Sequence, residues 1–238
     1  MKGYKSTYKD VVEVALPMET RTYKPISNIE IITEIRKQAK INSLTIQGEG
    51  YRLSNDNNIM TSMFAFTPPQ LANELSMMVI INNSYDHKSS LSCGIGALVL
   101  ICSNGVIRMQ KKSDMRRAHK GNIQNDLTTI ISETLDRLKP EYAKLVDEVT
   151  TMQNLIVPKA KLHEIVGRLY FEENILNTSQ MSLLKRNSNS PKNPFRLDEK
   201  ELTLWKIYNN VTETLKYSHP KDIVKNHLLT HKFFTEKV

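Results

Sequence analysis

Between Met77 and Leu138 the spacing of apolar residues changes from two to about 3.6, and this change constrains the fold more than any other feature. From Leu91 to Ile101 alternate residues are apolar, which is the pattern of a strand with one buried face. From Ile123 to Leu138 apolar residues recur three or four positions apart, as on one side of a helix. We therefore predict a sheet that leads into an amphipathic helix.

A long β-hairpin is expected within this region. The pair Asn104-Gly105 follows the alternating run, and Asn-Gly is the preferred centre of a two-residue type I′ turn. The chain should reverse there, so that residues 106–111 return antiparallel to the preceding strand. Further strands are predicted over residues 41–53, 60–67 and 75–82, with an edge strand at Val11 to Leu16.

Helices are predicted on both sides of these strands. Ser27 and Glu30 have capping-box spacing and should start a helix that ends near Ala39 or Lys40. Pro140 should close or interrupt the helix that follows the hairpin. Further helical segments are expected over 141–156 and 159–171, after an Asp198 N-cap and after Pro220, with a flexible loop over 183–195.

These elements predict an α+β fold, with an antiparallel sheet and long β-hairpin in the N-terminal half and helices in the C-terminal half. Residues 1–140 would form the α+β core, and residues 141–238 a helical subdomain packed on it. No apolar run approaches the roughly 20 residues of a membrane-spanning helix, and no signal peptide opens the chain. We therefore expect a cytoplasmic protein with no membrane partner.

The chemistry-bearing residues provide no catalytic signature. The sequence has no G-x-S-x-G motif, and its G-I-G lies inside a predicted strand, where it cannot cradle phosphate. His227 and His231 are four apart on a predicted helix, but no glutamate follows the first histidine and no third ligand is evident. Cys93 and Cys102 lie in the apolar run and suit packing rather than a disulfide. We expect no enzyme activity, no metal and no cofactor.

Charge favours a polyanionic partner, because the formal net charge is +8 and the pI is about 9.3. Much of the positive charge is concentrated between Val106 and Gly121, a segment that we call the cationic strip. It has one acidic residue, Asp114, and six cations: Arg108, Lys111, Lys112, Arg116, Arg117 and Lys120. The strip is either a solvated surface loop or a phosphate-binding segment that leads into a helix N-terminus.

The polar residues 82–86 also have two interpretations. They could be a turn in which Asn and Asp side chains bond their own backbone. Alternatively, Asn83 and Tyr85 could lie on a binding surface beside the cationic strip.

Several motifs resemble those of a phage- and plasmid-like family called domain of unknown function 932. The resemblance covers an N-S-Y-D-x-x-S-S turn from Asn83 to Ser90, a C-x-N-G-V hairpin from Cys102 to Val106, and the H-K-G of His119 to Gly121. It implies an origin in mobile genetic elements and no particular activity. Tyr85 stands where many members have histidine, which weakens any chemistry that needs an imidazole there.

The predicted order of helix, strands, long hairpin and helix is also similar to the core of single-strand annealing proteins. That similarity is architectural and implies assemblies that hold single-stranded DNA by its backbone. We therefore expect a homo-oligomeric protein that binds single-stranded DNA in recombination or replication. The predicted contacts are Arg108, Lys111, Lys112, Arg116, Arg117, His119, Lys120, Tyr85 and Asn83.

Two other classes of function stay open at the level of the sequence. The first is an anti-defence or host-takeover protein that binds a host protein through the 185–195 loop and the aromatic pair Phe233 and Phe234. The second is an enzyme acting on nucleic acid or nucleotides, which would need a compact cluster of acidic residues.

Overall fold

The computed structural model of the chain describes residues 4–68, 75–87, 89–99, 104–108, 116–117, 123–197 and 201–238. Within these residues it contains seven helices and a seven-stranded antiparallel sheet. The strands are β1 (Tyr4–Ser6), β2 (Ile46–Leu53), β3 (Ile59–Phe66), β4 (Leu75–Ser84), β5 (Leu91–Val99), β6 (Asn104–Arg108) and β7 (Arg116–Arg117). The helices are α1 (Tyr8–Val12), α2 (Asn28–Ile41), α3 (Ile123–Asn154), α4 (Lys159–Phe171), α5 (Thr178–Ser188), α6 (Leu204–Leu215) and α7 (Pro220–Glu236).

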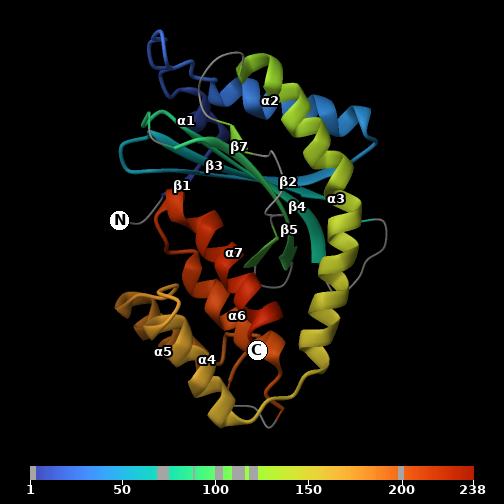
Figure 1. Cartoon of the computed structure of the whole chain (residues 1–238), viewed down its shortest axis with the longest axis vertical. Helices are drawn as coiled ribbons and strands as arrows, with labels where there is room; N and C mark the ends of the chain where they lie inside the picture. Colours follow the sequence, from blue (N-terminus) through green and yellow to red (C-terminus); the bar gives the residue numbers. More distant parts are fainter. Residues whose placement is uncertain are drawn as a thin grey trace.

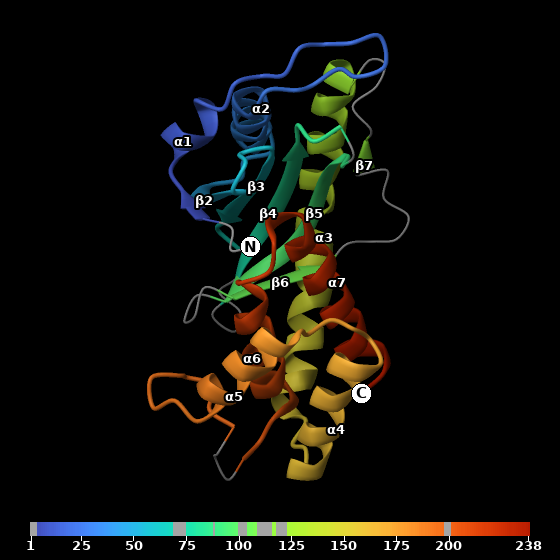
Figure 2. The same cartoon turned by 90° about the vertical axis from the view of Figure 1, so that its left-hand side faces the viewer.

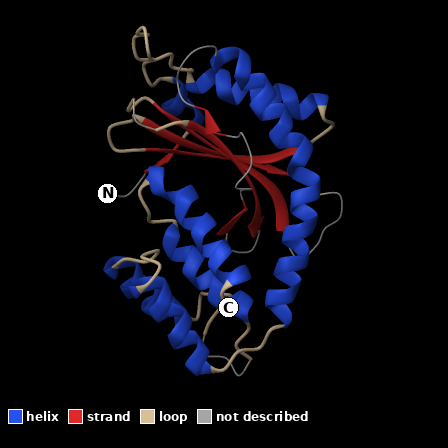
Figure 3. Cartoon of the chain, viewed as in Figure 1, coloured by secondary structure: helices blue, strands red, loops and turns tan. Residues whose placement is uncertain are grey.

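The α+β prediction is confirmed, because the strands occupy the N-terminal half and helices dominate the C-terminal half. The strands follow one another from β1 to β6 across the sheet, and β7 also pairs with β5. Figure 3 shows the sheet in the upper part of the molecule, with helices around it and below it.

Helices cover both faces of the sheet (Figure 1). On one face, alternate residues of β4 and β5 such as Val79 and Ile95 join the main core with Ile31 and Ile35 of α2. On the other face, Met78 and Ile80 of β4 pack against Val224 of α7. The period-2 prediction for β5 is confirmed, since Leu91, Cys93, Ile95 and Ala97 are all buried in the main core.

The start of α2 is the predicted capping box. The Ser27 hydroxyl accepts a hydrogen bond from the Glu30 N–H at 3.1 Å, and the Glu30 carboxylate accepts one from the Ser27 N–H at 2.9 Å. Each bond satisfies a backbone donor that the helix leaves free. A second capping box, of Thr7 and Asp10, starts α1. The predicted edge strand from Val11 is therefore wrong, since a local cap makes its first residues helical.

The hairpin is confirmed, but the predicted position of its turn is wrong. Asn104 and Gly105 are paired residues of β6, opposite Val99 and Leu98. The Asn-Gly pair therefore begins β6 and is not the centre of a two-residue turn. Asn-Gly is a strong local turn signal, yet the extension of β5–β6 pairing to Val99 leaves the pair inside the strand.

Several boundaries in the helical half also differ from the predictions. Helix α3 continues through Pro140, which therefore does not end it. The helix crosses residue 140, where the sequence predicts the α+β core to meet the helical subdomain, and side chains from both sides of this position belong to one hydrophobic cluster. Thr203, and not Asp198, is the N-cap of α6. Helix α5 takes up the first part of the predicted 183–195 loop. The helix predicted over 159–171 is confirmed as α4.

Among the described helices, none combines the length and the apolar character needed to cross a membrane.

An ion pair joins α2 to the sheet. The Arg36 guanidinium donates to both Glu49 carboxylate oxygens, at 2.9 and 2.6 Å, and lies 4.8 Å from the centre of the Tyr8 ring. The Tyr51 hydroxyl also donates to Glu49. These hydrogen bonds from Arg36 and Tyr51, together with the charge of Arg36, hold the pKa of Glu49 below its usual value of 4.5.

We expect acid to weaken this link. Because the carboxylate has a lower pKa in the folded chain than in the unfolded chain, its contribution is complete above about pH 4.5 and is lost below it. The free energy of unfolding should therefore fall less steeply between pH 5 and pH 3 in Glu49→Gln than in the unmodified chain. Urea denaturation across this pH range measures the difference, and parallel curves would contradict it.

Candidate nucleic-acid interface

The backbone places parts of the cationic strip along one edge of β5. Strand β6 pairs Arg108 with Ile95, and strand β7 pairs Arg116 with Ser92 and Arg117 with Leu91. The opposite edge of β5 pairs with β4, so β6 and β7 lie on the same side. The β5 residue that pairs with Arg108 lies three to four positions from those that pair with Arg116 and Arg117. At the rise of a strand this separation is about 10–13 Å.

Three of the six predicted cations therefore belong to strands that follow one another along a single sheet edge. The other predicted contacts of the strip, Lys111, Lys112, His119 and Lys120, lie outside the described residues. Strand β7 lies near the N-terminal part of α3 (Figure 2).

The β4–β5 turn is next to this edge, because β7 pairs with the first two residues of β5. Asn83, at the end of β4, is 1 % exposed, and Tyr85, the first residue after β4, is 5 % exposed. The Asn83 amide donates to the Ile26 carbonyl at 3.0 Å and to the Asn28 side chain at 2.8 Å. The Tyr85 hydroxyl accepts a hydrogen bond from the Asn28 N–H at 3.0 Å.

These contacts correct the predicted roles of Asn83 and Tyr85. Both side chains are inside the protein and connect the turn to the start of α2, so they are not placed to touch a nucleic acid. Burial also raises the pKa of the Tyr85 hydroxyl to about 12. The sequence offered a structural and a functional interpretation of these residues, and the geometry favours the structural one.

Removing the Tyr85 hydroxyl should destabilise the fold without affecting ligand binding. In Tyr85→Phe the buried Asn28 N–H has no acceptor, which costs about 1–3 kcal/mol. Urea denaturation should show a loss of this size, whereas oligonucleotide affinity of the folded variant should be unchanged. A Tyr85→Phe protein of full stability and reduced affinity would restore the predicted binding role.

His87 is the exposed aromatic side chain of the turn. Its ring centre lies 3.9 Å from that of Tyr23, with 40° between the planes, and Tyr23 is only 6 % exposed. His87 is a candidate contact that no sequence motif indicated. Its position in a segment of Asn, Asp and Ser residues could have indicated a turn residue with positive φ, a conformation in which histidine is enriched. The φ of His87 is indeed 59°.

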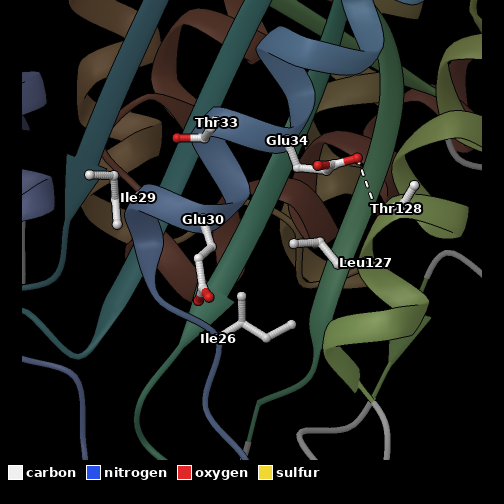
Figure 4. Close-up of a pocket in the computed structure, with 7 residues that line it drawn as sticks. All are labelled: Ile26, Ile29, Glu30, Thr33, Glu34, Leu127 and Thr128. Atoms are coloured by element: carbon white, nitrogen blue, oxygen red, sulfur yellow. Dashed lines mark hydrogen bonds between the residues drawn. The ribbon is translucent and has the colours of Figure 1, made fainter.

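A cleft of about 440 Å³ lies between α2 and α3 near this end (Figure 4). Ile26, Ile29 and Leu127 provide its apolar lining, and Glu30 and Glu34 its acidic lining. Thr128 of α3 donates to the Glu34 carboxylate at 2.9 Å. Two carboxylates make this cleft a poor phosphate site.

The two histidines of α7 are buried rather than presented to solvent. His227 is 4 % exposed and His231 is 5 % exposed. The His231 Nε2 lies 3.0 Å from a Glu148 carboxylate oxygen of α3, so this histidine connects the two helices. Within the described ranges, no cluster of three or more His, Cys, Asp or Glu side chains could hold a metal ion.

The aromatic pair predicted to contact a host protein is also buried. Phe233 is 1 % exposed and Phe234 is 3 % exposed, and Phe234 packs edge-on against Tyr208 of α6. The prediction of an accessible aromatic C-terminus is therefore wrong, because the apolar face of α7 closes the helical core. The last part of the 185–195 segment is held by Asn193, whose amide donates to the Asn187 carbonyl at 2.9 Å.

Together these features define an α+β protein with an antiparallel sheet between helices. Three arginines of the cationic strip lie on strands β6 and β7, which pair with one edge of β5. The chain belongs to the family described as Domain of unknown function (DUF932), whose model matches residues 15–230. This match confirms the resemblance that the turn, hairpin and H-K-G motifs indicated. No curated protein and no solved structure matches the chain, and the similarity to annealing proteins is not confirmed.

Proposed function

We propose that this protein binds nucleic acid, with single-stranded DNA preferred, and acts without catalysis as a homo-oligomer in the recombination or replication of a phage or other mobile element. The site would be the β5 edge with the cationic strip, in the cytoplasm of a bacterial host cell. The strip cations would neutralise phosphates, and strands β6 and β7 would hold three of them beside one edge of β5.

One observation supports this proposal above the others. Arg108 precedes Arg116 and Arg117 by eight and nine residues, yet all three belong to strands that pair with the same edge of β5. A polymer can contact cations that are spread along such an edge, whereas a small anion needs only one or two of them. The net charge of +8 adds a long-range attraction in the same direction.

Binding can be tested by fluorescence anisotropy with labelled single- and double-stranded oligonucleotides across a salt titration. Six cations in contact with phosphates of a single strand would give a log–log slope of about −4. Sizing chromatography on the same samples reports the size of the assembly. A protein that binds neither oligonucleotide at low salt would refute the proposal. A stoichiometric host protein retained from nuclease-treated lysate would then support the host-factor alternative.

A further inference from the structure

We propose that the exposed ring of His87, which packs against the buried ring of Tyr23, is a stacking platform for an unpaired base. This inference depends on the proposed nucleic-acid binding and adds to it a named base contact and a reason for single-strand preference. Phosphate contacts alone do not distinguish a single strand from a duplex, whereas a ring that stacks on a base face needs a base that is not enclosed in a helix.

The two rings have the geometry of a platform. The imidazole lies over the Tyr23 ring at 3.9 Å between centres, and Tyr23 is nearly fully buried, whereas His87 is exposed. The Tyr23 hydroxyl donates to the Ser84 carbonyl at 3.2 Å, which attaches the lower ring to the end of β4. The two planes are tilted by 40°, so Tyr23 braces the inner side of the imidazole, and a base could stack on its outer face.

The turn that carries His87 is held in place before any ligand arrives. The Asp86 carboxylate accepts hydrogen bonds from the Ser89 N–H at 2.8 Å and from the Ser89 hydroxyl at 2.9 Å. On the other side of His87, the Tyr85 N–H donates to the Asn58 carbonyl at 2.7 Å. A contact residue on a fixed turn loses little conformational freedom on binding, which favours affinity.

The platform is also close to the predicted phosphate contacts. Arg117 pairs with Leu91, which is four residues after His87, and Arg116 pairs with Ser92. A strand whose phosphates follow β7 would therefore pass the end of the β4–β5 turn. Arg21, two residues before Tyr23, is exposed as well and adds positive charge to this end.

The test compares one variant on two ligands. His87→Asn removes the aromatic ring but keeps a residue that tolerates positive φ, so the turn should be preserved. We expect it to lose about fivefold or more in affinity for a single-stranded oligonucleotide. For a matched oligonucleotide with abasic sites, which offers phosphates without bases, its affinity should equal that of the unmodified chain. His87→Tyr should restore binding to the complete oligonucleotide.

The control and the contrary outcomes separate this inference from the proposed function. His163→Ala, at an exposed histidine of α4, should leave both affinities unchanged. If His87→Asn binds both ligands as the unmodified chain does, or weakens both equally, the stacking role is refuted while nucleic-acid binding stands. If the unmodified chain binds neither ligand, the proposed function itself fails.

Discussion

Reversing both charges in Arg116→Glu/Arg117→Glu is expected to weaken the binding of a single-stranded oligonucleotide by at least about tenfold near 0.1 M salt. Each phosphate contact with a single strand contributes about 0.7 to the slope of log affinity against log salt. Losing two contacts should therefore flatten the slope by about 1.4, and the added negative charges should repel the strand further. Anisotropy titrations at several salt concentrations measure both quantities.

A matched control is available on α5. Lys185 and Arg186 are likewise adjacent in the sequence; they are exposed and lie in the helical half of the chain. Lys185→Glu/Arg186→Glu changes the net charge by the same amount, so it reports the effect of overall charge alone. If both double variants weaken binding equally, the β5 edge has no special role. Binding that neither variant affects would place the contacts elsewhere.

Asn83→Ala, at the end of β4, should strongly destabilise the fold. Its amide donates to the Ile26 carbonyl and to the Asn28 side chain, and the site is almost fully buried. Removing it leaves two buried acceptors without a donor, which we expect to lower the free energy of unfolding by about 2–4 kcal/mol. Urea denaturation measures this loss directly.

The neighbouring Asn82 provides the comparison for that substitution. It is only partly buried and accepts one hydrogen bond, from the Thr61 hydroxyl at 2.8 Å. Asn82→Ala should therefore cost about 0.5–1.5 kcal/mol. Equal costs at the two positions would mean that the Asn83 contacts do not hold the turn to α2. If Asn83→Ala is as stable as the unmodified chain but fails to bind oligonucleotides, the residue belongs to the interface.

The turn shows why a sequence motif and a binding site need not coincide. Asn83 and Tyr85 attracted attention because amides and tyrosines commonly bind ligands, but here they join β4 to the first turn of α2. His87 lies beside them and remains exposed. Chain position alone could not separate these roles, because the separation depends on α2, whose residues lie more than 50 positions earlier.

Local patterns were enough for the features whose causes are local. Three such features are the capping box of Ser27 and Glu30, the alternating face of β5 and the amphipathic stripe of α3. Each of them depends on residues that are only a few positions apart in the sequence. The same locality explains the errors. Asn104-Gly105 is a turn signal that longer strand pairing overrides, and Pro140 is a helix-breaking residue that nevertheless lies within a continuous α3.

What the chain order could not specify is which distant segments share a surface. The placement of Arg108, Arg116 and Arg117 beside one edge of β5 follows from the pairing of two separate strands with β5. The ring contact of His87 with Tyr23 joins residues 64 positions apart. Burial of Phe233 and Phe234 likewise depends on where α7 packs. Composition and periodicity predict how each segment folds. Long-range packing determines which side chains from different segments are exposed side by side, and these side chains form a binding surface.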